Sequence, residues 1–279
     1  MTLEQKLLIF LIIFLLIVGG IIALAISLSV YNSKYRNFVL QHSDSLKQLE
    51  IINDKYHFTH VKHCDLSHSY DNETYYGKIS TRDYLIYHLA HSQNQVIKSI
   101  DAAKSNKRMF ENYQKEIEEK CKPGSFDTPE LLPNKKKLLR TESKLFYYSV
   151  KQPETSFSIG VYLKLTNIKG AHRSGKSDRF SSSEILELIK RVNNRSGYYF
   201  NDQEIWDAVC RVERGKVSNK LRFRIYERDG WRCKLCGRKT QNLEIDHIIP
   251  IAKGGKTTYN NLQTLCHKCN QRKGTDIYY

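Results

Sequence analysis

The chain has 279 residues, which allows one large domain or two of modest size, and its formal charge at pH 7 is +16. A balance this basic favours a polyanion or an anionic membrane surface as partner. Seven cysteines, an odd number that includes two Cys-x-x-Cys pairs, argue against an extracellular disulfide framework and for metal binding in a reducing compartment. From Arg211 to Tyr279 there are 16 Lys/Arg and 6 Asp/Glu. Such a concentration of charge is typical of a nucleic-acid-binding domain, and a solvated basic surface is the alternative.

The first segment of interest is an uncharged stretch, Leu7–Val30. As a helix it would be about 36 Å long, enough to cross a hydrocarbon core of ~30 Å. A cleaved signal peptide is the rival, but its apolar stretch is shorter and follows a basic region, whereas only Lys6 precedes this one. We therefore expect an uncleaved transmembrane anchor within residues 1–33, with residues 7–30 in a lipid bilayer. The positive residues that follow the anchor predict a single-pass membrane protein whose remainder is cytoplasmic.

Residues 34–122 are predicted to be helical, because apolar residues recur at helical spacing over about 34–56 and 81–120. The two stretches could pair as an antiparallel coiled hairpin. Between them His57, His60 and His63 stand three residues apart, next to Cys64. On one helix these histidines would share a face and could hold a transition metal; a polar, partly exposed segment is the alternative.

Residues 123–218 are interpreted as a linker followed by a small α+β domain. Prolines and a glycine punctuate the linker between Cys121 and Pro133. Leu145–Val150 and Phe157–Leu165 are rich in aromatic and β-branched residues and predict strands. A capping box at Ser181–Glu184 predicts a helix to about Val192, and Gln203–Arg214 predicts another.

Residues 219–279 carry the clearest chemistry. They begin with a basic amphipathic stretch, Leu221–Asp229, and contain two Cys-x-x-Cys pairs, made by Cys233, Cys236, Cys266 and Cys269. Each pair can point two thiolates at one ion, and four thiolates close a tetrahedral zinc site, so the zinc should be structural. The interval between the pairs is longer than in a simple zinc ribbon, which indicates an inserted element.

The inserted element has an ordered set of motifs. Asp246 and His247 lie in the middle of a predicted strand, a Gly254-Gly255 loop follows, and a second strand after Asn261 leads into a helix from about His267. With the Asn270-x-x-Lys273 that follows Cys269, these residues resemble the HNH endonucleases of the ββα-metal fold, in a variant with asparagine as the last letter. The resemblance covers about 220–277.

The resemblance implies a role for each matching residue. His247 is the general base that takes a proton from the attacking water, and Asp246 is a ligand of a catalytic divalent ion, Mg²⁺ or Mn²⁺. Asn261 holds the loop that positions His247. Asn270 stands where the family often has histidine, and its amide oxygen can also bind a hard cation. Candidate phosphate contacts are Lys253, Lys256, Lys268, Arg272 and Lys273. Glu244 and His267 are interpreted as surface residues.

The sequence thus predicts an α+β protein with four parts: a transmembrane helix (1–33), a helical region (34–122), a linker with an α+β domain (123–218) and an HNH nuclease module with a four-cysteine zinc site (219–279). The expected function is membrane-anchored, metal-dependent hydrolysis of DNA, double-stranded by expectation, in restriction or phage defence. Two alternatives stay open, a catalytically silent zinc-dependent DNA-binding protein and a membrane-linked scaffold or signalling protein. Self-association into a homo-oligomer is also left open.

Overall fold

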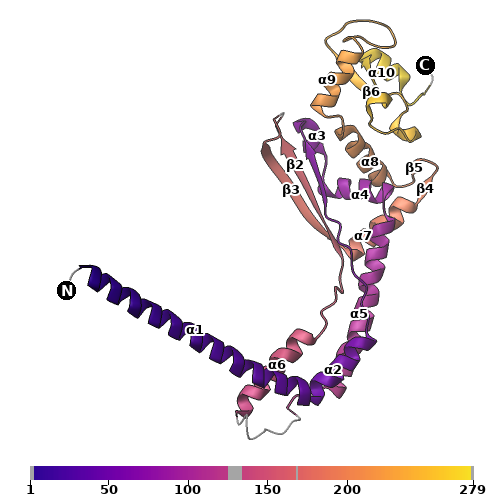
Figure 1. The fold of residues 1–279 in the computed structure, drawn as a ribbon. Coiled ribbons are helices and arrows are strands. Elements are labelled where there is room, and N and C mark those ends of the chain that lie inside the picture. Colours follow the sequence, from indigo (N-terminus) through magenta and orange to yellow (C-terminus); the bar gives the residue numbers. More distant parts are fainter. Residues whose placement is uncertain (1–2, 125–133, 168, 278–279) are drawn as a thin grey trace. The chain divides into compact units, whose positions relative to one another are not determined.

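The computed structural model describes residues 3–124, 134–167 and 169–277 (Figure 1). The chain divides into two compact units. Unit 1 consists of Met1–His60 and Ser105–Thr155, and unit 2 of Val61–Lys104 and Ser156–Tyr279. Much of the expected linker between Cys121 and Pro133 lies outside the described residues.

Unit 1 is helical. Its elements are α1 (Leu3–His42), α2 (Asp44–Lys55), the second part of α5 (Asn94–Lys120) and α6 (Lys135–Ser149). Helix α2 packs against α5 through the buried side chains of Leu49, Ile52 and Tyr113. The pairs Asn53–Tyr113 and Thr59–Asn106 show that the two segments run in opposite directions.

The expected transmembrane anchor is wrong. No helix within the described part of the chain is both long enough and apolar enough to cross a membrane. Helix α1 continues beyond the uncharged stretch Leu7–Val30, and its last turns bury Tyr35 and Val39 against Leu46 and Leu138. The single-pass membrane localisation and the lipid-bilayer contact through residues 7–30 depended on this anchor and are corrected with it.

The expected strand Leu145–Val150 is also wrong, because these residues belong to α6 and its C-cap. The Asn134 side chain caps the helix by accepting a hydrogen bond from the Lys137 N–H. Leu138, Leu145 and Phe146 face the same cluster at helical spacing. Tertiary packing of this face outweighs the aromatic and β-branched composition that favoured a strand.

The histidine-rich segment is polar and largely exposed, in agreement with the alternative to a metal site. Residues 56–65 are neither helix nor strand, so His57, His60 and His63 do not share a helix face. Among the described residues, the group of three or more His, Cys, Asp or Glu side chains close enough to hold one ion is made of cysteines in the C-terminal module.

Unit 2 contains a three-stranded sheet in the order β1-β2-β3, built from β1 (Leu66–Tyr70), β2 (Ser158–Thr166) and β3 (His172–Ser181). Strand β2 confirms the predicted second strand; it pairs in parallel with β1 and antiparallel with β3. Alternate residues of β2 (Ile159, Val161, Leu163 and Leu165) point into the core. A strand with one buried face must be covered on that side by other elements.

Helices of unit 2 cover this face and complete the core. They are α4 (Thr81–His91), α7 (Ser182–Asn193) and α8 (Gln203–Gly215), with the short α3 (Glu73–Lys78) beside them. The predicted capping box is confirmed at the start of α7, where Ser181 and Glu184 bond to each other's backbone N–H. The predicted helix over Gln203–Arg214 is α8. Between α7 and α8 lies a small hairpin, β4 (Arg195–Ser196) and β5 (Tyr199–Phe200).

The C-terminal module follows α8 within unit 2. It contains α9 (Asn219–Arg228), an antiparallel pair of strands, β6 (Leu243–His247) and β7 (Leu262–Cys266), and α10 (His267–Lys273). Two short 3₁₀ turns, Ile251–Lys253 and Tyr259–Asn261, lie in the loop between the strands. In Figure 1 the module lies beside α8. The strand, loop, strand and helix order predicted from the sequence is therefore present.

Candidate active site and metal centre

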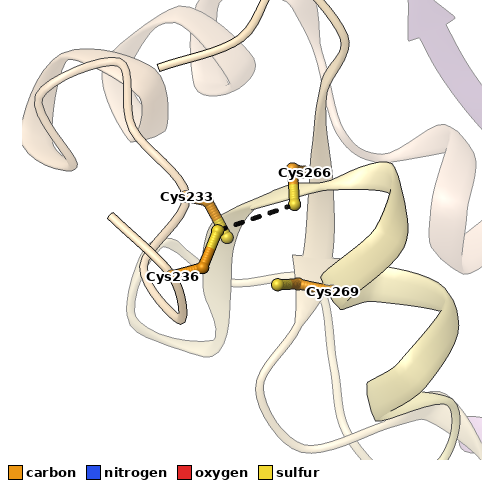
Figure 2. A group of neighbouring side chains, drawn as sticks. All are labelled: Cys233, Cys236, Cys266 and Cys269. Carbon is orange, nitrogen blue, oxygen red and sulfur yellow. Dashed lines mark hydrogen bonds between the residues drawn. The ribbon is translucent and has the colours of Figure 1, made fainter. Parts of the chain in front are cut away.

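The four cysteines of the two Cys-x-x-Cys pairs converge (Figure 2). Their sulfur atoms all lie within 4.8 Å of one another. Cys236 Sγ and Cys266 Sγ are 3.8 Å apart, and tetrahedral coordination with Zn–S bonds of ~2.3 Å places two sulfurs about 3.8 Å apart. The residues therefore fit a closed, structural zinc site.

The protonation of the thiols supports the same assignment. Burial opposes ionisation of Cys233, but backbone N–H groups of neighbouring residues lower its pKa to about 6. Burial and the adjacent thiols raise the pKa of Cys269 to about 12. Four thiols this close cannot all ionise without a cation among them, and zinc supplies that charge.

The end of α9 fixes the second strand of the hairpin. Arg228 donates to the carbonyl oxygens of Tyr259 and Leu262, at 2.8 and 2.7 Å. Asp229 accepts from the Thr264 N–H at 2.8 Å and pairs with Arg228. Arg228 and Asp229, which lie just before the first Cys-x-x-Cys pair, thus tie this end of the zinc cluster to β7.

Strand β6 carries three residues of the candidate active site. In an ideal strand, Asp246 and His247 would point to opposite faces. Here Glu244, Asp246 and His247 all line one cleft of about 570 Å³. The hairpin therefore brings the proposed base and the proposed metal ligand together at the end of β6.

The Asp246 carboxylate is held in place by an ammonium group and a side-chain amide, both on the same oxygen. Lys273 Nζ lies 3.1 Å from Asp246 Oδ2, which also accepts from Gln263 Nε2 at 3.1 Å. Lys273 is 2% exposed and donates to the His247 carbonyl at 2.9 Å. Its ammonium therefore supports β6 from inside, away from solvent and from a bound phosphate.

His247 is 8% exposed and is oriented by one hydroxyl. Its Nε2 lies 2.8 Å from Thr257 Oγ1, which donates to the Glu213 carbonyl oxygen at 2.6 Å. Because the Thr257 proton is used at Glu213, Oγ1 must accept from the ring, so Nε2 carries the proton and Nδ1 keeps its lone pair. Burial lowers the pKa of His247, while the carboxylates of Glu213 and Asp246 raise it. The net shift of the pKa is downward, so the ring is neutral near pH 7.

Glu213 is the anchor of Thr257 and belongs to α8, outside the HNH motifs. It is 3% exposed, and its carboxylate accepts from the Thr257 N–H at 2.5 Å and from Lys216 Nζ at 3.1 Å. The neighbouring helix thus holds the loop that orients the histidine.

Asn261 closes the loop between the two strands. Its amide donates to the carbonyls of Ile249 and Lys256, at 3.1 and 2.9 Å, and its Oδ1 accepts from the Ile249 N–H at 2.8 Å. Gly255 lies under the same turn, where an added Cβ would meet the Ile249 carbonyl oxygen at 1.8 Å. Only glycine fits there, and Asn261 makes the contacts that a loop-holding role requires.

Glu244 and His267, interpreted from the sequence as surface residues, lie in the cleft with Asn270. His267 Nδ1 is 2.7 Å from Glu244 Oε1, and Asn270 Nδ2 donates to Glu244 Oε2 at 2.5 Å. With its amide nitrogen committed to Glu244, the orientation of Asn270 is fixed, and its Oδ1 is the atom left to bind a cation. A Mg²⁺ ion needs few protein oxygens because it retains several waters; Asp246 and Asn270 both line the cleft, and each has a side-chain oxygen of the kind that this ion binds.

Residues that precede the first Cys-x-x-Cys pair form the opposite wall of the cleft. They include three aromatic residues, Tyr75, Tyr199 and Trp206, and two arginines, Arg214 of α8 and Arg222 of α9. Of the candidate phosphate contacts, Lys253, Lys256, Lys268 and Arg272 are exposed on the module.

Sequence reasoning missed Thr257, Glu213 and the opposite wall. A threonine after a glycine pair and a glutamate inside a helix carry no local pattern that distinguishes them. For Glu244, the alternation of a strand offered a signal, because residues 244 and 246 share a face.

Comparison with known proteins places the module in a family. Residues 233–278 match the family model of the HNH endonucleases. A 56-residue stretch is 43% identical to part of the CRISPR-associated endonuclease Cas9 of Corynebacterium diphtheriae, which is 19% of this chain and 5% of that protein. No solved structure matches the chain. The predicted resemblance is confirmed: residues 233–278 are an HNH endonuclease domain with a zinc-type cysteine cluster. The chain spans only a small part of the relative, so the likeness ends at the module.

Proposed function

We propose that the protein is a divalent-metal-dependent endonuclease that hydrolyses phosphodiester bonds of DNA. The observation that carries the proposal is the meeting of His247, Asp246 and Asn270 in one cleft of an HNH module. These side chains supply a neutral base and two oxygen donors for a hard cation, which are the groups that phosphodiester hydrolysis requires.

In this mechanism His247 Nδ1 accepts a proton from the attacking water, while Thr257 holds the ring by Nε2. Asp246 and Asn270 would hold a Mg²⁺ or Mn²⁺ ion, which stabilises the negative charge developed on the phosphate and the leaving oxygen when bound. Lys273 pairs with Asp246 and holds it in place. Asn261 fixes the loop from Ile249 to Lys256 and thereby the end of β6.

The charge of the module supports DNA as the substrate. The net charge of the chain is +16, and the exposed lysines Lys253, Lys256 and Lys268, with Arg272, lie on the module. Phosphate contacts of this kind give affinity without reading the sequence. The zinc cluster joins the segment before β6 to the end of β7 and to α10, and so holds the hairpin and α10 together.

A role against foreign DNA, in restriction or phage defence, is the biological context we propose. It is supported by the resemblance to a CRISPR-associated endonuclease over the module. Challenge of cells that carry the gene or its His247→Ala variant with phage provides the test. Equal plaque numbers for both would contradict this context and leave the chemistry untouched.

Plasmid cleavage by the zinc-loaded full-length protein tests the activity itself. With Mg²⁺ or Mn²⁺ we expect nicked or linear DNA from the parent and neither from His247→Ala. His172→Ala, which changes an exposed histidine on β3, is the matched control and should cut like the parent. If the parent binds plasmid and branched DNA without cutting either, whichever ion is supplied, that result would contradict this proposal and indicate a zinc-dependent DNA-binding protein.

A further inference from the structure

The wall of the cleft that faces the HNH residues differs from them in chemistry. The HNH side presents carboxylates and amides, with Glu244, Asp246 and Asn270. The other side presents aromatic rings and guanidinium groups from α3, β5, α8 and α9. A metal-binding side opposite a cationic, aromatic side is the arrangement that a nucleotide would fit, with the phosphate toward the cations and the base against the rings.

Arg222 is the cation on this wall that most needs an anion. It is half-buried on α9, and its side chain bonds to tyrosines: Nη2 donates to the Tyr75 hydroxyl at 3.3 Å, and Tyr226 is the other partner. Among the described residues no carboxylate pairs with it, although charges removed from water are ordinarily paired. A phosphate in the cleft would supply the missing negative charge and suits the bidentate geometry of a guanidinium.

Tyr199 and Trp206 line the same cleft as that arginine and present an aromatic surface there. Their ring centroids are 5.3 Å apart and the planes are tilted by 41°. Tyr199 is 49% exposed although it lines the cleft, and Trp206 is half-buried. Exposed aromatic rings are the usual platform on which proteins stack the bases of single-stranded nucleic acids.

We propose that Arg222, Tyr199 and Trp206 form a subsite for one unstacked nucleotide of the DNA strand being cut, with its phosphate on Arg222 and its base on the rings. The proposal rests on the proposed function and names its substrate class: DNA with an unpaired nucleotide at the cleavage site. A cleft of about 570 Å³ has the size of a small-molecule pocket, suited to a nucleotide and too small for a duplex.

The unpaired base follows from the geometry of stacking. In a duplex both faces of each base are covered by its neighbours, so a protein ring reaches a base only when that base is single-stranded, bulged or flipped out. The subsite therefore changes the expectation of double-stranded DNA: single strands, flaps and bulges should be better substrates than a perfect duplex.

Fluorescence of Trp206 tests the subsite directly. The chain has two tryptophans, so Trp231→Phe leaves Trp206 as the reporter, and His247→Ala in the same protein prevents cleavage. The full-length, zinc-loaded double variant is titrated with a 12-nucleotide oligothymidine and with a blunt, perfectly paired two-stranded duplex. We expect quenching by the oligothymidine, and a shift of about tenfold to higher concentration for the duplex.

Substitution of Arg222 supplies the second arm. Arg222→Gln should weaken binding of a labelled oligothymidine by about tenfold, measured by anisotropy in the His247→Ala protein. Arg224→Gln is the matched control, because Arg224 is on the same helix, carries the same charge and does not line the cleft; it should change binding by less than about twofold.

Two results would overturn the subsite. One is equal quenching by oligothymidine and by the paired duplex; the other is equal loss of binding in the Arg222 and Arg224 variants. Tighter binding of oligouridine than of oligothymidine would contradict DNA as the class. If the parent cuts plasmid while the fluorescence of Trp206 does not change, the subsite is wrong and the nuclease function stands. If the fluorescence is quenched but the parent does not cut DNA, the subsite stands and the nuclease function is wrong.

Discussion

The two walls of the cleft come from different parts of the chain. One wall comes from residues 244–275, which include the proposed base and the proposed metal ligands, and the four-cysteine cluster belongs to the same module. The other is assembled from residues between Tyr75 and Arg222 that share no motif. The proposed chemistry is thus encoded locally, whereas the proposed selection of substrate depends also on residues of α3, β5, α8 and α9 that precede the first Cys-x-x-Cys pair.

The link between the walls is a chain of hydrogen bonds. Glu213 of α8 holds Thr257, and Thr257 holds His247. The HNH module is therefore oriented by the helix on which it lies. Variants within the module and at the link to α8 distinguish the contribution of the module from that of α8.

Loss of zinc should have the largest effect, because the folding of the HNH module, which forms one wall of the cleft, depends on the metal. Cys269→Ser, or chelation of the parent, should abolish cleavage and unfold the module, since a structural zinc contributes on the order of 10 kcal/mol to folding. Zinc content and thermal unfolding measure this. Cys64→Ser, outside the cluster, is the control. Full activity in a zinc-free protein would contradict a structural role.

Removal of the base should be the next largest effect. We expect His247→Ala to lower the cleavage rate by roughly 10²–10⁴-fold, with DNA affinity unchanged, because general base catalysis contributes about that factor. Single-turnover rates and a binding titration separate the two quantities. A variant that lost affinity and rate in parallel would show that His247 binds DNA instead of activating water.

The link through Thr257 should have an intermediate effect. Thr257→Val keeps the shape of the side chain and removes the hydroxyl that fixes the ring, and we expect kcat to fall roughly 10–100-fold with KM little changed. Thr257→Ser should restore most of the rate. ¹⁵N NMR of the His247 ring should report a proton on Nε2 in the parent and a mixture of tautomers in the valine variant. A parent ring protonated on Nδ1 would contradict the orientation described here.

The exposed lysines should have the smallest effect. Lys253→Gln or Lys256→Gln should weaken DNA binding modestly and reduce the slope of log K against log salt by about 1 each, without changing the preference between single strand and duplex. Titrations at several salt concentrations measure the slope. A changed preference between single strand and duplex would show that these lysines of the module take part in substrate selection. The division of roles between the two walls would then be wrong.

Elements set by local interactions were predictable from the sequence. Ser181 and Glu184 cap α7 through bonds within four residues, and the strand predicted over Phe157–Leu165 from its aromatic and β-branched composition is present as Ser158–Thr166. Leu145–Val150 was assigned to a strand from composition, whereas the packing of Leu138 and Phe146 makes it helical. The uncharged stretch Leu7–Val30 predicted a membrane anchor, which the described helices do not support.

What the sequence by itself determined is the local chemistry of the C-terminal module: the two Cys-x-x-Cys pairs, the Asp246-His247 strand, and the asparagines that match the HNH pattern. Tight spacing brings such residues together with little help from the rest of the chain. Tertiary structure decided the orientation of His247 by Thr257 and Glu213, and the meeting of Tyr199, Trp206 and Arg222 across the cleft. The reason is that these contacts join residues far apart in sequence, and only the packed core of unit 2 places α8 and β5 beside the module.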